Sequence, residues 1–460
     1  SNHDRIHDVA ISRGTLPLQP ISCFHFVSNF ANCVADIDVA SAGGFIPFLR
    51  MLHAKQGTIV TSNLPYENTI SVVDSEIMKS TLHIGDRPIG LFKFLEPLIG
   101  EDNYQIYNAE RDSKFKKVIR PALSHEVLRA KYEDMRSVGV DLIKRWEERL
   151  NSQDNVIRLQ EQGLEYSLRV TSKALIGSDT SRNFDFKKFK QHYDVTLSGL
   201  FDKQFGLLDA EREKDFQQSL DYFHTTLDKI IKDRKNMNVE PAPVKDFLDI
   251  LLTENDPDTG GYLTAGYHTT GVAIPFTIFA LTQNPRVKVK LQEEIDELLQ
   301  DRLPTFEDLS KMDYLTQVIK ESLRVHPPGT FCARLIKTDS TFPKAEENFK
   351  VQADSTVIYC IPLYHENPSY FPNPQKFDPS RFSRENINIK PNTYCPFGFG
   401  ARISERLAMI DIKMMVCMIV QKFDFELAMK LEDVQMEERF VVMAKNDILI
   451  KLKPRRGINT

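Results

Sequence analysis

The chain has 460 residues, of which 41% are hydrophobic, and its formal net charge at pH 7 is −5. This composition can supply a large core, and the slightly acidic balance gives no electrostatic case for nucleic-acid binding. The six cysteines are scattered without paired spacing, which argues against a disulfide framework or a zinc site and favours a reducing compartment. No apolar run approaches the roughly 18 residues that a membrane helix needs.

The first segment with strand character lies near the N-terminus. Residues 58–60 and 69–73 are rich in β-branched side chains, and an Asn-Leu-Pro sequence lies between them at 63–65. β-branched runs separated by turn-forming residues are typical of a hairpin. We therefore expect an N-terminal β-hairpin.

Helical periodicity follows, from about residue 105 to about residue 300. Three stretches combine charged residues with an apolar stripe at helical spacing: 132–150, 216–233 and 287–299. Each stretch predicts an amphipathic helix.

A second β region follows the two prolines at 327–328, and it includes residues 349–351 and 356–359. No repeat or low-complexity linker interrupts the chain. We therefore expect a mainly α protein with a small N-terminal and central β region. The expected domain spans residues 1–460, with β-rich portions at roughly 45–80 and 330–365 and α-rich portions at roughly 105–325 and 404–425.

A carboxylate and two arginines are candidates for a buried network. Glu321 and Arg324 are three residues apart and lie on one helix face, a spacing that an ordinary ion pair also explains. Residues 374–382 read Pro-Gln-Lys-Phe-Asp-Pro-Ser-Arg-Phe and resemble the P-x-x-F-x-P-x-R-F segment of the cytochrome P-450 family. The resemblance implies that Arg381 is a second arginine for the same carboxylate. A glutamate held by two planar guanidinium groups fixes geometry, so we expect this network to be structural.

A glycine-rich turn lies further on. Residues 397–404 read Phe-Gly-Phe-Gly-Ala-Arg-Ile-Ser and run into a strongly apolar helix. This turn resembles the haem-binding loop of the cytochrome P-450 superfamily. The motifs at 321–324 and 374–382 precede it in the family's order, and the resemblance covers roughly residues 45–455. The resemblance implies a single large cytochrome P-450-like domain.

The resemblance also implies a cofactor, heme b (iron protoporphyrin IX), and residues that bind it. The expected cofactor-binding residues are Phe397, Gly398, Gly400, Arg402, Arg334, Lys116, Ala265 and Gly266. Arg402, Arg334 and Lys116 match positions that meet the haem propionates, although an exposed arginine on a strand edge also explains Arg334. The two glycines of the turn can reach positive φ and approach the porphyrin closely.

The axial ligand is the point at which the chain departs from the family. The family's cysteine falls nearest to Ser404, and the loop is two residues short and has no cysteine. A serine hydroxyl is far too weak an acid to replace a thiolate, and Ser404 also suits the N-cap of the next helix. Two explanations stay open: the chain is a degenerate relative, or it omits residues here and in the similarly short stretch before Ala265.

Residues 265–270 resemble the family's distal helix motif, A-G-x-[DE]-T-T. The resemblance implies that Ala265 and Gly266 open a groove over the haem and that Thr269 helps to steer protons. His268 replaces the family's acid, and an imidazole can also relay protons. We therefore expect Thr269 and His268 to be catalytic. Alternatively, Thr269 bonds back to a carbonyl one turn earlier and His268 faces solvent.

Taken together, the resemblance implies a haem-dependent monooxygenase that inserts one oxygen atom from O2 into a small apolar substrate. It implies an external electron donor such as an NADPH-dependent reductase, no nucleic-acid partner, and a monomer. Similarity to microsomal members implies the cytosolic face of the endoplasmic reticulum membrane, through an N-terminal anchor that is absent here. The alternative is a fold that has lost the thiolate and serves as a small-molecule or haem-free binding protein, or as an isomerase or dehydratase.

Overall fold

The computed structural model covers the whole chain, and its described residues form a series of ranges. They are 45–63, 68–81, 86–88, 90, 93–100, 109–152, 154–177, 185–204, 208–236, 247–253, 259–342, 348–386, 388–398, 405–438 and 441–455.

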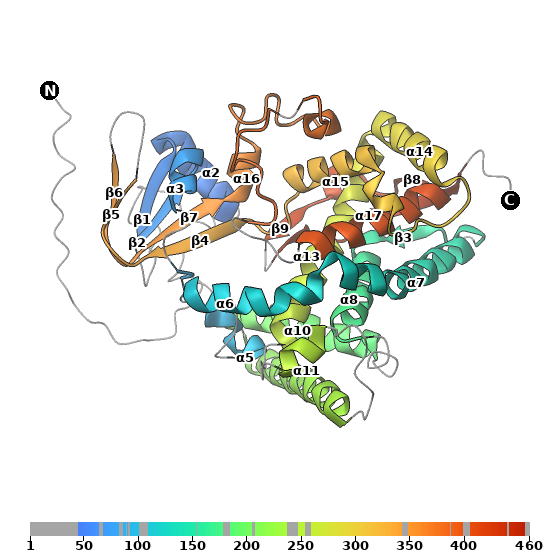
Figure 1. Cartoon of the computed structure of the whole chain (residues 1–460), viewed down its shortest axis with the longest axis horizontal. Coiled ribbons are helices and arrows are strands. Elements are labelled where there is room, and N and C mark those ends of the chain that lie inside the picture. The colour runs from blue at the N-terminus through green and yellow to red at the C-terminus, as the bar shows by residue number, and fades with distance from the viewer. Residues whose placement is uncertain are drawn as a thin grey trace.

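A β-rich part lies at one end of the molecule and the long helices fill the other (Figure 1). The main sheet has the strand order β1-β2-β7-β4. Its strands are β1 (Ile59–Asn63), β2 (Asn68–Val72), β7 (Ser355–Cys360) and β4 (Phe331–Ile336). β1 and β2 are antiparallel with Ile59 opposite Val72, which confirms the expected hairpin. β2 and β7 are parallel with Asn68 opposite Ser355, so the sheet joins segments from opposite halves of the chain.

Smaller sheets complete the β structure. One pairs β5 (Ser340–Phe342) with β6 (Phe349–Val351), another pairs β9 (Met436–Glu438) with β10 (Val442–Ala444), and a third has the order β3 (Val156–Arg158), β11 (Leu449–Pro454) and β8 (Phe423–Leu427).

Helices make up most of the rest of the described chain. The α-helices are α2 (Phe45–Gln56), α3 (Ser75–Thr81), α5 (Glu96–Ile99), α6 (Ala109–Ile119), α7 (His125–Leu150), α8 (Leu159–Leu175), α10 (Phe186–Gln204), α11 (Ala210–Asn236), α12 (Phe247–Thr253), α13 (Thr259–Gln283), α14 (Pro285–Leu299), α15 (Asp313–Val325), α16 (Ile361–His365) and α17 (Glu405–Lys422). Short 3-10 helices are η1 (Lys93–Leu95), η3 (Arg120–Leu123), η4 (Asp308–Ser310), η5 (Pro379–Phe382) and η6 (Leu431–Asp433). The three amphipathic stretches expected from periodicity fall within α7, α11 and α14, so these predictions are confirmed.

α13 is the central helix, and it packs closely on α8. Gly163 of α8 allows this approach: a Cβ atom there would lie 2.6 Å from Cγ of Pro275 and 2.8 Å from the carbonyl oxygen of Gly271. Both distances are too short for a real side chain. α13 also contacts α17, so both α8 and α17 pack against α13. This arrangement sets the walls of the candidate site.

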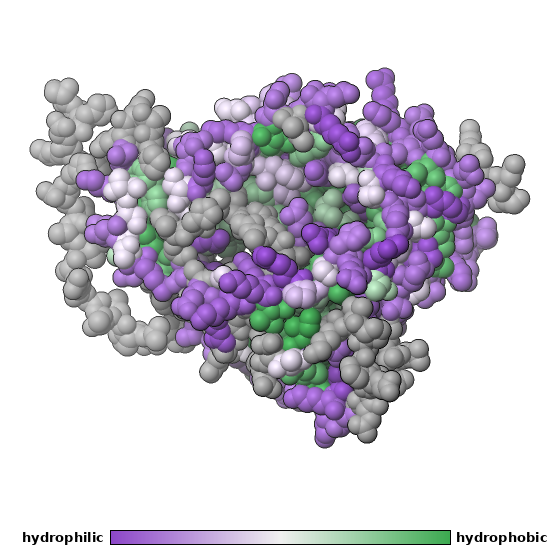
Figure 2. Space-filling model, viewed as in Figure 1, coloured by the Kyte–Doolittle hydropathy of each residue, from purple (hydrophilic) through white to green (hydrophobic). Residues whose placement is uncertain are grey.

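Two hydrophobic cores match the two parts of the molecule. The larger core joins the helices with β3, β8 and β11, and the smaller one fills the space between the main sheet, α2 and α3. The face drawn in Figure 2 is mostly hydrophilic, with smaller hydrophobic areas between polar ones. Within the described part of the chain, no helix combines the length and apolar character needed to cross a membrane.

Candidate functional site

The site is supported by an ion network on α15. Arg324 donates from Nε to Oε2 of Glu321 at 2.7 Å and from Nη2 to Oε1 at 2.9 Å. Arg381 donates from Nε to Oε1 of the same carboxylate at 3.3 Å. The side chains of Glu321 and Arg324 are 0% and 1% exposed, so water does not compete for this pairing. The structure thus brings together the three residues that the sequence suggested as a network.

The same arginines also hold in place the proline-rich meander, which comprises residues 366–382. Arg324 donates to the carbonyl oxygens of His365 and Pro374, at 2.9 and 2.8 Å. Arg381 donates to the carbonyl oxygens of Pro372 and Asn373, at 2.6 and 2.8 Å. Charge-assisted bonds of this kind are stronger than neutral ones. The network therefore fixes backbone position over a stretch that has little secondary structure of its own.

His365 connects this network to the glycine-rich segment. Its Nδ1 lies 2.9 Å from the carbonyl oxygen of Arg324, and its Nε2 accepts from the backbone N–H of Cys395 at 3.0 Å. This pattern requires a neutral ring with its proton on Nδ1. Burial lowers the pKa of His365 to about 3, so the ring stays neutral at physiological pH. Sequence reasoning gave this histidine no role, although it precedes the proline-rich meander that the motif covers.

The first glycine of the turn has the positive φ angle that the sequence analysis expected. The backbone N–H of Gly398 donates to the carbonyl oxygen of Cys395 at 2.8 Å, and Gly398 has φ of 80°. A Cβ atom at this position would lie 2.6 Å from Sγ of Cys332 on β4. Both the backbone angle and the close packing on β4 therefore require glycine. Gly400, Arg402 and Ser404 lie outside the described residues.

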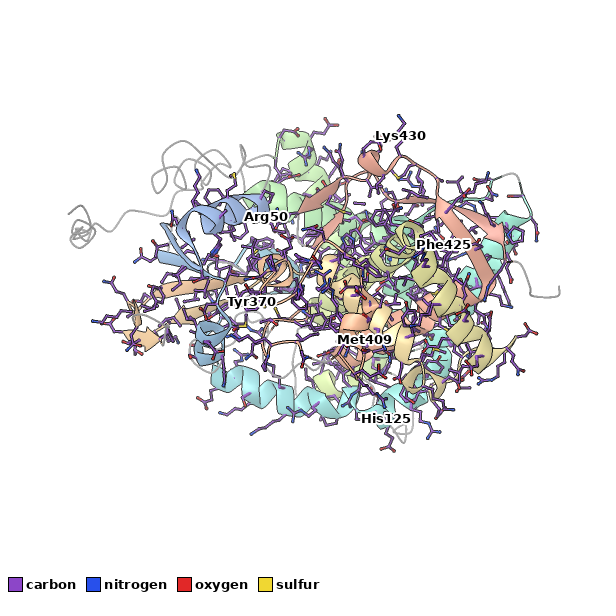
Figure 3. All side chains as sticks on the ribbon, turned by 90° about the horizontal axis from the view of Figure 1, so that it is seen from above. Arg50, His125, Tyr370, Met409, Phe425 and Lys430 are labelled. Atoms are coloured by element: carbon purple, nitrogen blue, oxygen red, sulfur yellow. The ribbon has the colours of Figure 1, made fainter. Side chains whose placement is uncertain are left out.

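Four of the expected residues meet at one cavity. Ala265, Gly266 and Thr269 of α13 and Phe397 of the turn line a space of about 50 Å³ between α13 and α17. The rest of the wall comes from residues of α8, α13 and α17 that were not among the expected catalytic or cofactor-binding residues: Val170, Thr171, Thr270, Leu407, Ala408 and Asp411. In the view of Figure 3, Met409, the neighbour of Ala408, is labelled among the helices, whereas Lys430 projects from the edge of the molecule. The walls of the cavity thus come from α8, α13, α17 and the turn.

Small side chains on α13 serve helix packing as well as this cavity. A Cβ atom at Gly266 would lie 2.8 Å from Cγ2 of Thr171, so the glycine lets α8 approach. The hydroxyl of Thr269 donates to the carbonyl oxygen of Ala265 at 2.7 Å, the back-bond that the sequence left open as an alternative. Such a bond leaves the oxygen of Thr269 able to accept a hydrogen bond from the cavity.

His268 lies on the other side of α13. The face of α13 that lines the cavity carries residues 265, 266, 269 and 270. Residues 267 and 268 lie on the opposite face of the helix. The His268 ring contacts Tyr267 and Tyr193, with ring centroids 4.2 and 5.2 Å apart. Burial, and secondarily the charge of Lys190, lowers its pKa to about 3. His268 is thus buried rather than facing solvent, and a catalytic role for it stays a prediction.

The two other cationic candidates are described but do not line the cavity. Arg334 belongs to β4 and is half-buried, and its Nη1 donates to the carbonyl oxygen of Ala333 at 2.8 Å. Lys116 lies in the last turn of α6 and is also half-buried. Their roles at haem propionates stay predictions.

Sequence reasoning missed Asp411 and its partner. Tyr166 of α8 donates to Oδ1 of Asp411 at 2.5 Å, and both side chains are buried. Burial raises the pKa of Asp411 to about 7, against the opposing effect of the hydrogen bond from Tyr166. The available signal was a carboxylate within the otherwise apolar stretch at 407–412.

Comparison with known proteins decides the family. Residues 37–452 match the family model described as Cytochrome P450. The chain belongs to the cytochrome P450 family. The crystal structure of the cytochrome P450DA heme domain has the same fold, with a TM-score of 0.79 and 19% identity, over 93% of this chain and 95% of that one.

Curated relatives belong to the same family. Cytochrome P450 4V2 from Homo sapiens is 32% identical over 273 residues, which are 52% of this chain and 51% of the relative. The chain thus spans about half the length of this human relative. Cytochrome P450 3A30 from Fundulus heteroclitus is 26% identical over 455 residues, 90% of this chain and 89% of that relative.

Membership of the cytochrome P450 family implies a haem cofactor, and the donor set can be tested against it. Cysteine thiolate is the ligand that favours oxygenase chemistry on haem iron. The sequence has no cysteine between Phe397 and Glu405. Cys395 precedes the turn, and its sulfur lies 3.8 Å from Nε2 of His365 rather than on the cavity wall. No cluster of metal-binding side chains occurs among the described residues. The residues present therefore do not fit a thiolate-ligated haem.

Proposed function

We propose that the protein is an oxidoreductase of the monooxygenase type, which inserts one oxygen atom from O2 into a small apolar substrate with electrons from an external donor. The observation that supports the proposal most is the Glu321–Arg324–Arg381 network and its link through His365 to the glycine-rich segment. This network fixes the start of the loop that carries the cofactor in the family. Membership of the cytochrome P450 family supports the same reaction class.

The residues on the cavity wall have simple roles in this proposal. Thr269 offers a hydroxyl oxygen as an acceptor, and Ala265 and Gly266 keep α13 narrow where it faces Phe397. Apolar lining with a few placed polar groups is typical of small-molecule sites. We further propose heme b as the cofactor, with Arg402, Arg334 and Lys116 at its propionates. A location on the endoplasmic reticulum membrane is part of the same proposal.

We keep one other function as the alternative, because the sequence has no cysteine between Phe397 and Glu405. A protein that keeps the fold without the thiolate would bind a small molecule without oxygenase activity.

The spectrum of the reduced protein with carbon monoxide separates the two functions, because the axial ligand sets the electronics of haem. A red-shifted Soret band indicates thiolate ligation, an unshifted band indicates haem without thiolate, and absence of the band indicates no haem. Turnover is then measured with an electron donor, ¹⁸O2 and a panel of small apolar compounds, and the proposal expects ¹⁸O in the product. Haem-free protein without ¹⁸O incorporation would overturn the monooxygenase proposal and leave the binding function.

A further inference from the structure

A second and larger cleft lies between α2 and the chain that follows α16. Its volume is about 710 Å³, within the roughly 300–1,000 Å³ that small-molecule sites occupy. Arg50 and Ala54 of α2 line it, together with Glu366 and Asn367, which directly follow α16. No described residue lines both this cleft and the cavity between α13 and α17. The cleft is therefore separate from the candidate site and has no role in the proposed function.

Hydrogen bonds between distant parts of the chain fix the walls of this cleft. Arg50 donates to Glu366 from Nε to Oε2 at 3.0 Å and from Nη2 to Oε1 at 2.8 Å, which joins α2 to the end of α16. The ring of His53 lies 2.8 Å from the carbonyl oxygen of Gly57 and 2.8 Å from Oγ of Ser71 on β2. This ring therefore holds the connection between α2 and β1 against the sheet. A cleft whose walls are fixed in advance binds a ligand at a lower entropic cost.

The charged groups of the cleft compensate each other. Arg50 and Glu366 form an ion pair, and burial lowers the pKa of His53, so that its ring is uncharged near neutral pH. The other described residues that line the cleft are not ionisable. An anionic ligand would be repelled by the carboxylate of Glu366, and a cationic ligand would be repelled by the guanidinium group of Arg50. The cleft therefore favours an uncharged ligand.

The same ion pair presents hydrogen-bond donors and acceptors side by side. A guanidinium group has five N–H donors, and Arg50 uses two of them on Glu366. Each oxygen of Glu366 accepts one of these bonds and has a further lone pair. The amides of Asn367 and Gln375 and the hydroxyl of Thr58 add polar groups of both kinds. Because a hydroxyl group donates and accepts at once, a ligand with neighbouring hydroxyl groups matches this arrangement.

We propose that the cleft between α2 and α16 binds an uncharged polyhydroxylated ligand, such as a neutral sugar. One hydroxyl group of the ligand donates to Glu366 and accepts from Arg50. A neighbouring hydroxyl group bonds to the amide of Asn367 or Gln375, and the carbon skeleton lies against the apolar side chain of Leu363. Binding is non-covalent and needs neither cofactor nor electron donor, so it does not depend on the proposed function.

Three probes that share one ring and differ in charge test the proposal. The full chain is titrated with glucose, which is neutral, with glucose 6-phosphate, which is anionic, and with glucosamine, which is cationic. Saturation-transfer NMR measures the dissociation constant of each. Glucose should bind saturably and more tightly than either charged probe.

A pair of matched variants on α2 tests whether the cleft is the binding site. Ala54 and Gln56 are both exposed, but Ala54 lines the cleft and Gln56 does not. Ala54→Trp places a large ring in the cleft and should abolish the binding of glucose. Gln56→Trp adds the same ring outside the cleft and should leave binding unchanged. Circular dichroism checks that both variants are folded.

Glu366→Gln tests the role of the ion pair. The substitution leaves the charge of Arg50 uncompensated, so the variant should bind glucose 6-phosphate more tightly than glucose. The proposal is overturned if the wild type does not bind glucose saturably or prefers a charged probe. Equal binding of glucose by Ala54→Trp and Gln56→Trp would overturn it as well, because the site would then lie elsewhere. An unchanged preference for glucose in Glu366→Gln would also overturn it, because the ion pair would then not select the ligand.

Discussion

Arg324 donates hydrogen bonds to both carboxylate oxygens of Glu321, one turn earlier on the same helix, at 2.7 and 2.9 Å. Both side chains are buried from solvent. Removing one partner of such a pair leaves an uncompensated buried charge, which typically costs about 3–5 kcal/mol. The pairing is therefore a structural requirement of the meander that it holds.

Glu321→Ala should lower the free energy of unfolding by about 3–5 kcal/mol, because it leaves Arg324 and Arg381 without their shared carboxylate. Chemical denaturation followed by circular dichroism measures the change. Glu110→Ala is the control, since the exposed Glu110–Lys114 pair contributes little. A Glu321→Ala protein as stable as the wild type would contradict the structural role.

Arg402→Leu and Arg334→Leu should weaken haem retention more than Thr269→Ala does. Two buried propionate groups need charge-assisted partners, whereas Thr269 already satisfies its hydroxyl donor within α13. The ratio of haem to protein after gel filtration gives the comparison. Equal ratios in all three variants would remove the arginines from their proposed positions.

His268→Phe tests whether this histidine carries protons. Because burial lowers the pKa of His268 to about 3, the ring is neutral near pH 7, and we expect the variant to keep the pH dependence of turnover. Contacts with Tyr193 and Tyr267 should remain, since phenylalanine is also aromatic. Steady-state rates across pH are the measurement. A shifted pH optimum would instead support the proton relay suggested by the sequence motif.

Asp411 should make stability depend on pH. Its folded pKa of about 7 lies above that of an unfolded aspartate, so the folded state holds the proton more tightly. The contribution of this group is present below about pH 4 and is lost as pH rises to about 7. Asp411→Asn should abolish this loss, as measured by thermal unfolding at a series of pH values. An identical pH profile in the two proteins would show that folding does not raise the pKa of Asp411.

His326 should have the opposite effect. It stacks on Phe276 with ring centroids 5.0 Å apart, and burial lowers its pKa to about 4. Stability from the neutral ring is present above the unfolded pKa of about 6.5 and is lost as pH falls towards about 4. The wild type should lose stability as the pH falls from neutral to acid. His326→Phe should lose less stability over the same change of pH. Unfolding midpoints at about pH 4.5 and about pH 7 compare the two proteins, and an unchanged difference would rule out this effect.

Local patterns explain what the sequence could predict. The hairpin of β1 and β2 follows from β-branched runs around a turn, and the spacing of Glu321 and Arg324 follows from one helical turn. The helical stretches within α7 and α11 were visible from periodicity alone. In these cases the information lies within a few turns of chain. Arg381 was suggested instead by the resemblance of residues 374–382 to a family motif, because it lies 60 residues from Glu321.

Packing between distant helices explains what the sequence could not predict. The bond between Tyr166 and Asp411 joins α8 to α17, and neither residue carries a local signal for the other. The direction of His268 depends on how α13 is rotated about its axis, which α8, α10 and α17 set through Gly266, Tyr193 and the cavity residues. A motif gives the order of residues on a helix but not the rotation of that helix within the fold.

The parallel pairing of β2 with β7 has a consequence for synthesis of the chain. Ile70 pairs with Val357, so the hairpin emerges from the ribosome long before its neighbouring strand exists. During that interval β2 presents an open edge, and unpaired edges recruit other strands. Contacts between positions so far apart also slow folding. Fragments that end before residue 355 should therefore aggregate through their N-terminal strands, and chaperone binding to the nascent hairpin would protect the protein until β7 is complete.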